Sequence, residues 1–572
     1  MKNMKKFAAM MAALTLSACS IAPMAMTASA ASVSLIMTAP DNLPSGATIQ
    51  ENVVAYQVFT TEVTGSVATS DRLMNITGWG SGVNVDGLIS DMKWDATTIT
   101  KDEKGANKAA ELINAEGFDL NAFAKAVINN KVGDGTTGTY DSDTTKVTFS
   151  DISDGYYAIS CTVKAATGDK HDSQSLGMLT VVDGDATQVG ENGTAKIGLP
   201  QVMKKVKEDT HEIDGAASIG HITESENWND VADYDIGDAV PFKLYGTLPS
   251  DFDNYDTYYY CFNDTLGKEF IAPSEDDIVV KVDGTEITTG FSKTVTPATE
   301  TDDNKIEIKF DNLKAEGLTV KKESVITVEY SAVLRKAAEV GKPGQENAVN
   351  LTYSNNPNKQ GAGETGTTPD DKVKVYTYAL EIEKTFFNAA GGPITVDELE
   401  NGTYEQVVFN LSKDGSTLKF SEYDGEGDYD YVVDENGNVD LTLAEVNKEL
   451  VIRIKGLDDG TYTLTETTAP KGFNKASDQT ITINADTEND QTWNGTASDE
   501  TLNSFKWTVG TEEEEGSVDD ALAYTEVMNK KGSELPSTGG MGTKIFYLGG
   551  GAMVAVAGVF LITKKRMGKS EN

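Results

Sequence analysis

Short segments with alternating apolar and polar residues recur along most of this chain of 572 residues. They are rich in β-branched and aromatic residues, and every second side chain of a β-strand points to the same face of its sheet. Clear examples are residues 52–59, 155–159, 202–206, 258–264, 347–353, 380–384 and 524–529. A strand with one apolar face must bury that face against another layer, so the pattern predicts an all-β fold of stacked sheets.

The length of the chain and the turn-rich stretches between these segments indicate several domains in a row. We expect an N-terminal domain at residues 31–195, a middle β-sandwich at residues 196–377 and a C-terminal β-sandwich at residues 378–532. Residues 106–113 and 120–128 have the apolar spacing of a helix instead. This spacing predicts a short helical insertion in the N-terminal domain.

A few polar residues interrupt the apolar faces of the two later domains. They are Lys204, Asp264 and Asn347 in the middle domain, and Lys384, Glu466 and Asn529 in the C-terminal domain. Strand alternation places Lys204 on one face with Val202 and Val206, where burial of a charged amine is costly. The pKa of Lys204 should therefore fall, and a carboxyl group buried near it should remain protonated. Asp235 and Asp238, which flank a turn, are alternative acids for the middle domain.

Both ends of the chain carry segments typical of export. Three lysines and an apolar stretch precede Ala28-Ser29-Ala30, which predicts a signal peptide at residues 1–30. The uncharged residues 545–563 are long enough to cross a membrane as a helix, and a basic cluster follows them. The segment before this span is Leu535, Pro536, Ser537, Thr538 and Gly539, whose proline favours an extended backbone. We therefore expect the chain to leave the cytoplasm with its C-terminal end in the membrane.

The composition argues against several classes of function. There are 90 acidic and 48 basic residues, and the net charge of −42 argues against a nucleic-acid partner. Three histidines and three cysteines, without a convergent catalytic or metal motif, predict no metal, no cofactor and no enzymatic turnover. Cys161 and Cys261 fall in different predicted domains, so we expect no disulfide bond between them. Cys19 ends a Leu-Ser-Ala-Cys sequence that resembles a lipoprotein cleavage site, which leaves lipidation of Cys19 as an alternative.

These motifs resemble those of known surface proteins. The Leu-Pro-Ser-Thr-Gly segment, its spacer, the apolar span and the basic tail resemble the sorting signal of proteins that sortase anchors in Gram-positive bacteria. Residues 462–473 closely resemble the E-box of collagen-adhesin B-type domains. The polar residues of the middle domain, together with residues 232–238 and 353–357, are similar to the isopeptide-forming domains of sortase-assembled major pilins. The resemblance is strong from residue 196 onward and weak before it.

The resemblance implies a rod of tandem immunoglobulin-like β-sandwiches that ends in a transmembrane sorting helix. It also implies two amide bonds within the chain, each between the first and the last strand of a domain. These bonds would run from Lys204 to Asn347 and from Lys384 to Asn529, with Asp264 and Glu466 as their proton shuttles. Such a tie would keep the terminal strands from peeling away under a pull along the rod.

A bond between chains is implied as well. By resemblance, sortase cuts between Thr538 and Gly539, and a lysine of the next subunit attacks the acyl-enzyme. Lys196 is the candidate for that lysine, because it stands alone at the junction after the first domain and precedes Lys204 by eight residues. The usual Tyr-Pro-Lys-Asn pilin motif is absent here. A solvated linker lysine is the alternative.

By this resemblance, the chain is the major shaft subunit of a secreted pilus anchored to the cell wall. The implied partners are pilin-type and housekeeping sortases, identical subunits and peptidoglycan, and the resemblance leaves host or mucosal ligands open. The alternative function is that of a wall-anchored adhesin that never polymerises, or of an ancillary pilin.

Overall fold

The structure is a computed structural model that describes most of residues 31–532. It leaves out residues 39–48, 65–72, 142–145, 166–169, 183–184, 190–194, 197–198, 210–216, 220–221, 225–227, 360, 401, 426, 447–448 and 488–501 within that range. The predicted signal peptide, the Leu-Pro-Ser-Thr-Gly segment and the predicted membrane span lie outside the described residues. Among the helices that the structure describes, none is long and apolar enough to cross a membrane.

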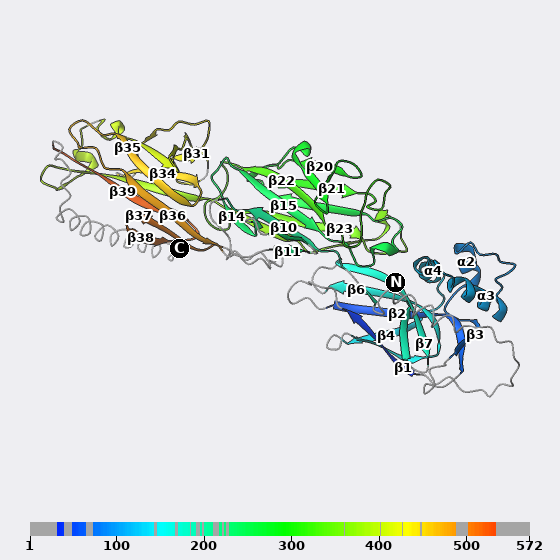
Figure 1. The fold of residues 1–572 in the computed structure, drawn as a ribbon. Coiled ribbons are helices and arrows are strands. Elements are labelled where there is room, and N and C mark those ends of the chain that lie inside the picture. The colour runs from blue at the N-terminus through cyan, green and yellow to red at the C-terminus, as the bar shows by residue number, and fades with distance from the viewer. Residues whose placement is uncertain are drawn as a thin grey trace.

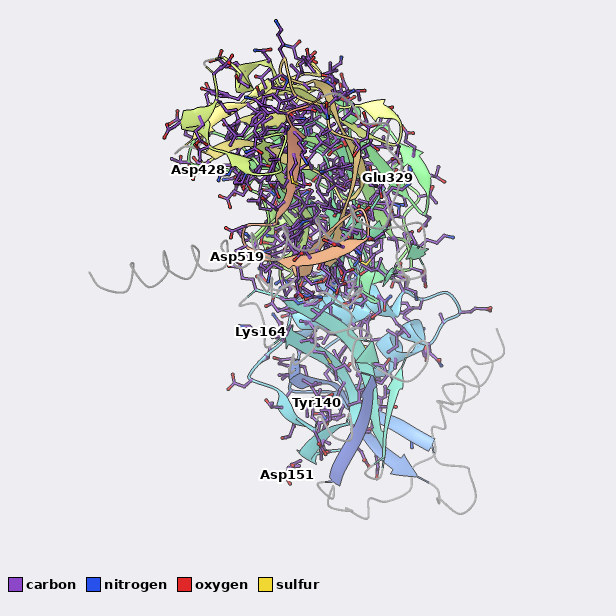
Figure 2. The ribbon with its side chains drawn as sticks, turned by 90° about the vertical axis from the view of Figure 1, so that its left-hand side faces the viewer. Tyr140, Asp151, Lys164, Glu329, Asp428 and Asp519 are labelled. Atoms are coloured by element: carbon purple, nitrogen blue, oxygen red, sulfur yellow. The ribbon has the colours of Figure 1, made fainter. Side chains whose placement is uncertain are left out.

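Figure 1 shows three β-rich bodies in line, which we call the N-terminal body (residues 31–196), the middle body (199–376) and the C-terminal body (378–530). The mostly β architecture confirms the predicted fold class. Exposed acidic side chains such as Asp428 and Asp519 of the C-terminal body, labelled in Figure 2, carry part of the large negative charge at the surface.

In the N-terminal body the strands form one continuous sheet, in the order β8-β7-β6-β2-β4-β5-β1-β9, with β3 on β2. The strands are β1 (Ala31–Thr38), β2 (Ile49–Thr64), β3 (Leu73–Trp79), β4 (Thr136–Asp141), β5 (Lys146–Ile152), β6 (Gly155–Ala165), β7 (Asp172–Val182), β8 (Asp185–Val189) and β9 (Ala195–Lys196). One apolar cluster around Phe149 and Ile159 and another around Phe59 and Phe123 are both buried. Strands alternate their side chains between two faces, so this sheet is covered on both of them.

Three helices of the N-terminal body cover one face of that sheet. They are α2 (Val85–Asp91), α3 (Glu103–Ile113) and α4 (Leu120–Asn129). Asp102 and Asp119 begin α3 and α4 by accepting hydrogen bonds from backbone amides of the first turn, as N-cap residues do. The predicted helical insertion is confirmed, whereas the sequence reasoning missed the seven-residue helix α2.

The middle body is a sandwich of two sheets around an apolar core that is rich in aromatic rings. The first sheet contains β13 (Trp228–Asn229), β10 (Val202–Lys207), β15 (Ala239–Gly246), β22 (Ile326–Leu334), β18 (Val279–Val282) and β19 (Thr285–Ile287), with β17 (Phe270–Ile271) on β22. The second contains β14 (Val231–Asp233), β25 (Asp371–Tyr376), β23 (Gln345–Ser354), β16 (Tyr260–Leu266), β21 (Asn304–Phe310) and β20 (Ser292–Thr296), with β24 (Thr365–Thr367) on β23. The hairpin of β11 (Ala217–Ile219) and β12 (Ile222–Glu224) is separate from both sheets.

The C-terminal body is a second sandwich with its own core. Its first sheet contains β27 (Pro393–Ile394), β26 (Tyr378–Phe387), β34 (Glu449–Leu457), β31 (Tyr431–Val433) and β30 (Phe420–Glu422), with β33 (Ala444–Val446) on β34 and β39 (Leu522–Lys530) on β26. Its second sheet contains β29 (Ser416–Thr417), β28 (Val408–Lys413), β35 (Gly460–Thr468), β36 (Gln479–Thr487), β37 (Leu502–Val509) and β38 (Glu512–Gly516), with β32 (Leu441–Thr442) on β28. The first strand, β26, and the last, β39, are therefore hydrogen-bonded neighbours, and they run parallel.

Polar contacts link each body to the next. At the first junction, the side-chain amide of Asn355 donates to the carboxylate of Asp172 at 2.7 Å, and the Tyr353 hydroxyl donates to the Asp172 carbonyl at 2.8 Å. At the second junction, the backbone amide of Ile236 donates to the carbonyl of Gly456 at 3.0 Å. A single residue, Thr377, separates β25 from β26, so little chain is available for the middle and C-terminal bodies to move apart.

Candidate functional site

The three polar residues predicted for the middle body come together in its core. Lys204 lies on β10 of the first sheet, whereas Asp264 on β16 and Asn347 on β23 belong to the second sheet. Strand alternation turns all three side chains toward the space between the sheets, where each residue is at most 2% exposed. The site therefore spans the two layers of the sandwich.

A hydroxyl group that the sequence reasoning missed connects these residues. The Lys204 ammonium donates to Asp264 Oδ2 at 2.7 Å, and the Tyr330 hydroxyl donates to the same oxygen at 2.7 Å. The Asn347 side-chain amide donates to the Tyr330 oxygen at 2.9 Å, and Lys204 Nζ lies 3.3 Å from it. The alternation of Ile326, Val328 and Tyr330 on β22 was the available signal, because it points the tyrosine inward.

Burial dominates the electrostatics of this cluster. Desolvation lowers the pKa of Lys204, against the opposing charge of Asp264. Desolvation likewise raises the pKa of Asp264, against the opposing effects of Lys204 and Tyr330. The Lys204 amine also lies 5.5 Å from the ring centre of Phe242. Both shifts favour a neutral amine beside a neutral carboxylic acid, which is the protonation state that an attack by the amine needs.

The side-chain carbonyl oxygen of Asn347 has no hydrogen-bond donor among the residues that the structure describes. Asn347 Oδ1 and Asp264 Oδ1 are both buried and accept no hydrogen bond from any residue that the structure describes. Buried polar atoms nearly always have a partner. A proton on Asp264 would supply a donor where the cluster now lacks one.

The C-terminal body holds the second predicted set in a similar arrangement. Lys384 lies on β26, Glu466 on β35 and Asn529 on β39, and all three are at most 3% exposed. Lys384 Nζ is 3.5 Å from Glu466 Oε1 and donates to the carbonyl of Val527 at 2.9 Å. The Asn529 amide donates to Glu466 Oε2 at 2.9 Å. Glu466 therefore lies between the amine and the amide that a crosslink would join.

The strand register accounts for this geometry. In the parallel pairing of β26 with β39, Lys384 lies opposite Val527 and Phe386 lies opposite Asn529. Desolvation lowers the pKa of Lys384 to about 8, against the opposing charge of Glu466. The amine is therefore neutral in a large fraction of molecules at a mildly alkaline pH.

One expectation about these sites needs correction. Asn347 does not lie on the last strand of the middle body, because β24 and β25 follow β23; only the C-terminal pair joins a first strand to a last one. Lys205, the next residue on β10, points to the opposite face of the sheet, where it is also buried and forms an ion pair with the buried Asp230. The sheet is covered on that side too, which alternation within one strand cannot reveal.

The remaining predicted site residues lie elsewhere. The backbone of Lys196 lies in the short strand β9, paired in parallel with β1, and not in an open linker; its side chain is not among those described. Leu535 to Gly539 fall outside the described residues. The alternative acids Asp235 and Asp238 lie in the loop that faces the C-terminal body, where Asp235 accepts a hydrogen bond from the Asp458 amide at 2.8 Å.

Comparisons with known proteins match two parts of the chain to families. Residues 405–497 match the family described as the SpaA prealbumin-like fold domain. This range includes Glu466, whereas Lys384 and Asn529 lie outside it. Residues 528–567 match the LPXTG cell wall anchor motif. The second match confirms the predicted sorting signal and identifies the chain as a cell-wall-anchored surface protein.

Solved structures show distant likeness over most of the chain. The T6 backbone pilin of serotype M6 Streptococcus pyogenes is 14% identical, with a TM-score of 0.45, over 88% of this chain and 99% of that one. The major pilin SpaD of Corynebacterium diphtheriae is 12% identical, with a TM-score of 0.43, over 88% and 98%. The major pilin SpaA of the same organism is 13% identical, with a TM-score of 0.39, over 88% and 100%. A search of curated proteins gave no match, and structural likeness at this level carries no functional conclusion.

Proposed function

We propose that this chain is the shaft subunit of a covalent pilus, polymerised by sortase and stabilised by one amide crosslink in each of its two later bodies. The observation that carries the proposal is the pair of buried lysine, carboxyl and asparagine clusters in consecutive bodies of a wall-anchored chain. An ion pair buried in an apolar core is costly as a stabilising device alone. An amide bond to the asparagine would remove the charge of the lysine, and release of neutral ammonia would leave the carboxyl group protonated and therefore uncharged as well.

The chemistry in the middle body begins with proton transfer from Lys204 to Asp264, 2.7 Å away. The neutral amine attacks the side-chain carbonyl carbon of Asn347, while protonated Asp264 donates a hydrogen bond to the carbonyl oxygen and polarises it. The new C–N bond forms, Asp264 gives its proton to the asparagine nitrogen, and the C–N bond to that nitrogen breaks as ammonia leaves. The Asp264 carboxylate then takes the extra proton from the lysine nitrogen, which leaves a neutral amide and a protonated acid. Tyr330 holds both the carboxyl group and the amide in position, and is therefore a positioning residue in this scheme.

The same steps apply in the C-terminal body, with Lys384 as the nucleophile, Asn529 as the electrophile and Glu466 as the proton shuttle. The Asn529 nitrogen already donates to Glu466 Oε2. The nitrogen that would leave as ammonia is therefore next to the group that protonates it. Each cluster reacts once with itself, so neither is the active site of an enzyme with turnover.

The two crosslinks would resist force in different ways. A bond between Lys204 and Asn347 would tie the two sheets of the middle body together across its core. A bond between Lys384 and Asn529 would tie β26 to β39, the strands at which a pull along the chain enters and leaves the C-terminal body. Since β26 and β39 are already hydrogen-bonded, this bond would prevent their sliding apart.

Polymerisation would use the sorting signal and the N-terminal junction. Sortase would cut between Thr538 and Gly539 and hold the Thr538 carbonyl as an acyl-enzyme. The deprotonated amine of Lys196 from another subunit would then attack this carbonyl and release the enzyme. A housekeeping sortase would finally transfer the polymer to peptidoglycan.

An adhesin that is anchored to the wall without polymerising, or an ancillary pilin, is the second candidate. The absence of the Tyr-Pro-Lys-Asn motif around Lys196 favours it. Both candidates share the anchor and the two crosslinks, so the acceptor lysine separates them.

An immunoblot of cell wall released by muramidase tests the two candidates. Wild type, Lys196→Ala and Lys170→Ala are compared, the last as a control for an exposed lysine of the same body. A ladder of SDS-resistant polymers that collapses in Lys196→Ala alone is the expected result. A single band in wild type would overturn the pilus proposal, and a ladder that survives in Lys196→Ala would refute Lys196 as the acceptor.

A further inference from the structure

Carboxylates from two bodies meet at the second junction of the rod. Asp233 ends β14 of the middle body, whereas Asp458 and Asp459 form the turn between β34 and β35 of the C-terminal body. Each can place one carboxylate oxygen within 4.8 Å of those of the other two. Asp233 is 1% exposed and Asp458 is 3% exposed, while Asp459 is half-buried. We call these three residues the junction triad.

Asp233 lacks the partners that a buried carboxylate requires. Neither of its side-chain oxygens makes a hydrogen bond of normal geometry to any described residue. Burial and the nearby carboxylates of Asp458, Asp459 and Glu208 raise the pKa of the Asp233 carboxyl group well above its usual range, and the Tyr378 hydroxyl opposes this only in part. Burial of a charged group without paired donors is unfavourable, and a bound cation is one of the ways in which proteins satisfy it.

The surroundings of the triad are strongly negative. The backbone amide of Asp233 donates to the buried carboxylate of Glu208 at 3.3 Å, and Asp235 accepts from the backbone of Asp458. Lys413 opposes this charge, with Nζ 2.7 Å from Asp458 Oδ2. Asp458 Oδ1 accepts the amide of Asp459 at 2.8 Å. One ammonium group does not balance the negative charge of these neighbouring carboxylates. The oxygens of Asp458 can still bind an ion, because a carboxylate oxygen can accept more than one contact.

We propose that the junction triad binds a Ca²⁺ ion between the middle and C-terminal bodies. The ligands are hard oxygen donors without histidine or cysteine, which suit Ca²⁺ or Mg²⁺ and not Zn²⁺ or copper. Ca²⁺ accepts an irregular shell of carboxylate, carbonyl and water oxygens, whereas Mg²⁺ requires a small, nearly ideal octahedron. A wall-anchored protein lies outside the membrane, where modules with calcium affinities of about 10⁻⁴–10⁻³ M operate.

The consequence would be a joint whose stiffness depends on calcium. The segment around Asp233 already contacts the C-terminal body through the hydrogen bond from Ile236 to Gly456. An ion bound by Asp233 of the middle body and by Asp458 and Asp459 of the C-terminal body would link the two bodies and stabilise that contact. This role goes beyond covalent assembly, and it does not depend on whether the chain polymerises.

Terbium luminescence provides the direct test, with the full chain purified in detergent and stripped of metal. Tb³⁺ replaces Ca²⁺ at oxygen sites, and the nearby tyrosines Tyr378 and Tyr462 would sensitise its emission; the Tyr462 hydroxyl donates to the Asp458 carbonyl at 2.7 Å. We expect tyrosine-excited emission that Ca²⁺ displaces and that equimolar Mg²⁺ does not. In Asp233→Asn and in Asp459→Asn the affinity for Ca²⁺ should fall at least about tenfold.

An exposed acidic residue supplies the control. Asp276→Asn changes the same functional group in a solvent-exposed turn of the middle body and should leave the emission unchanged. Asp459 is half-buried, so its replacement disturbs the core less than Asp233→Asn does. If the chain with Asp233→Asn does not fold, the Ca²⁺ affinity of Asp459→Asn tests the site. Absence of sensitised emission in wild type, or emission of unchanged affinity in Asp459→Asn, would overturn the proposal. Displacement by Mg²⁺ as readily as by Ca²⁺ would refute the choice of ion.

Discussion

Replacement of Glu466 by glutamine should leave the C-terminal body uncrosslinked while its overall shape is preserved. Glutamine fills nearly the same volume, but it cannot accept the proton from Lys384 or return it to the leaving ammonia. The wild-type chain should weigh about 34 Da less than its sequence mass, because each bond loses ammonia of about 17 Da. The Glu466→Gln chain should show a deficit of about 17 Da relative to its own sequence mass.

The structure sets the size of the accompanying loss in stability. A bond between Lys384 and Asn529 closes a loop of roughly 145 residues, which removes about 5 kcal/mol of entropy from the unfolded chain in the treatment developed for disulfides. Engineered crosslinks often give less than this value. The unfolding transition of the C-terminal body should therefore move to lower denaturant concentration by an amount equivalent to several kcal/mol, while that of the middle body stays in place.

Intact-mass spectrometry, peptide mapping and a urea titration of the full chain measure these effects. Glu513→Gln, on the exposed strand β38, is the matched control and should keep both bonds and both transitions. A wild-type mass equal to the sequence mass would refute the crosslink itself. A Glu466→Gln chain that still carries both bonds would refute the role of Glu466 as proton shuttle.

Three further predictions test the remaining parts of the argument. In Tyr330→Phe the crosslink of the middle body should still form, but more slowly, because the phenol positions the reacting groups without transferring a proton. A time course of intact mass after refolding measures the rate of crosslinking. An unchanged rate would count against the positioning role. In Asn529→Ala, which cannot form the C-terminal bond, the lowered pKa of Lys384 means that the folded body binds fewer protons than the unfolded chain between about pH 8 and 10.5. The free energy of unfolding, measured by urea titration, should therefore rise with pH across that interval. A free energy of unfolding that falls with pH there would contradict the lowered pKa of Lys384. Gly456→Ala should weaken the second junction by about 1–2 kcal/mol, because the backbone φ is +90° and a Cβ would lie 2.7 Å from the side chain of Ile236. Calorimetry should show a lower unfolding temperature. An unchanged unfolding temperature would mean that the junction accommodates the methyl group without cost.

Much of the candidate site could be predicted because strand alternation is a strict rule. In a strand with one apolar face, a polar residue in phase with that face points into the core, and this places Lys204, Asp264 and Lys384 there. Alternation does not say which strands face each other. The sequence predicted that the two residues of each pair lie on the first and the last strand of their domain. This holds for Lys384 and its partner, but not for Asn347, since β24 and β25 follow β23.

Residues whose role depends on a partner far away in the chain were missed for the same reason. Tyr330 has an ordinary strand sequence around it, and its place in the cluster comes from its hydrogen bond to Asp264, 66 positions earlier. Likewise, alternation assigns Lys205 to the face opposite Lys204, but it does not reveal that this face is covered or that Lys205 pairs there with Asp230.

The sequence by itself determined that this chain is exported, that it carries a cell wall anchor, that it is built from β-strands and that a few polar residues lie on apolar faces. These properties are local, because each depends on hydrophobicity, periodicity or a short motif within one segment. Only the tertiary structure decided that β26 and β39 lie side by side, that Tyr330 links the middle cluster, and that Asp233 meets Asp458 and Asp459 between two bodies. These are contacts between segments separated by many residues, and they are set by how sheets pack and bodies join.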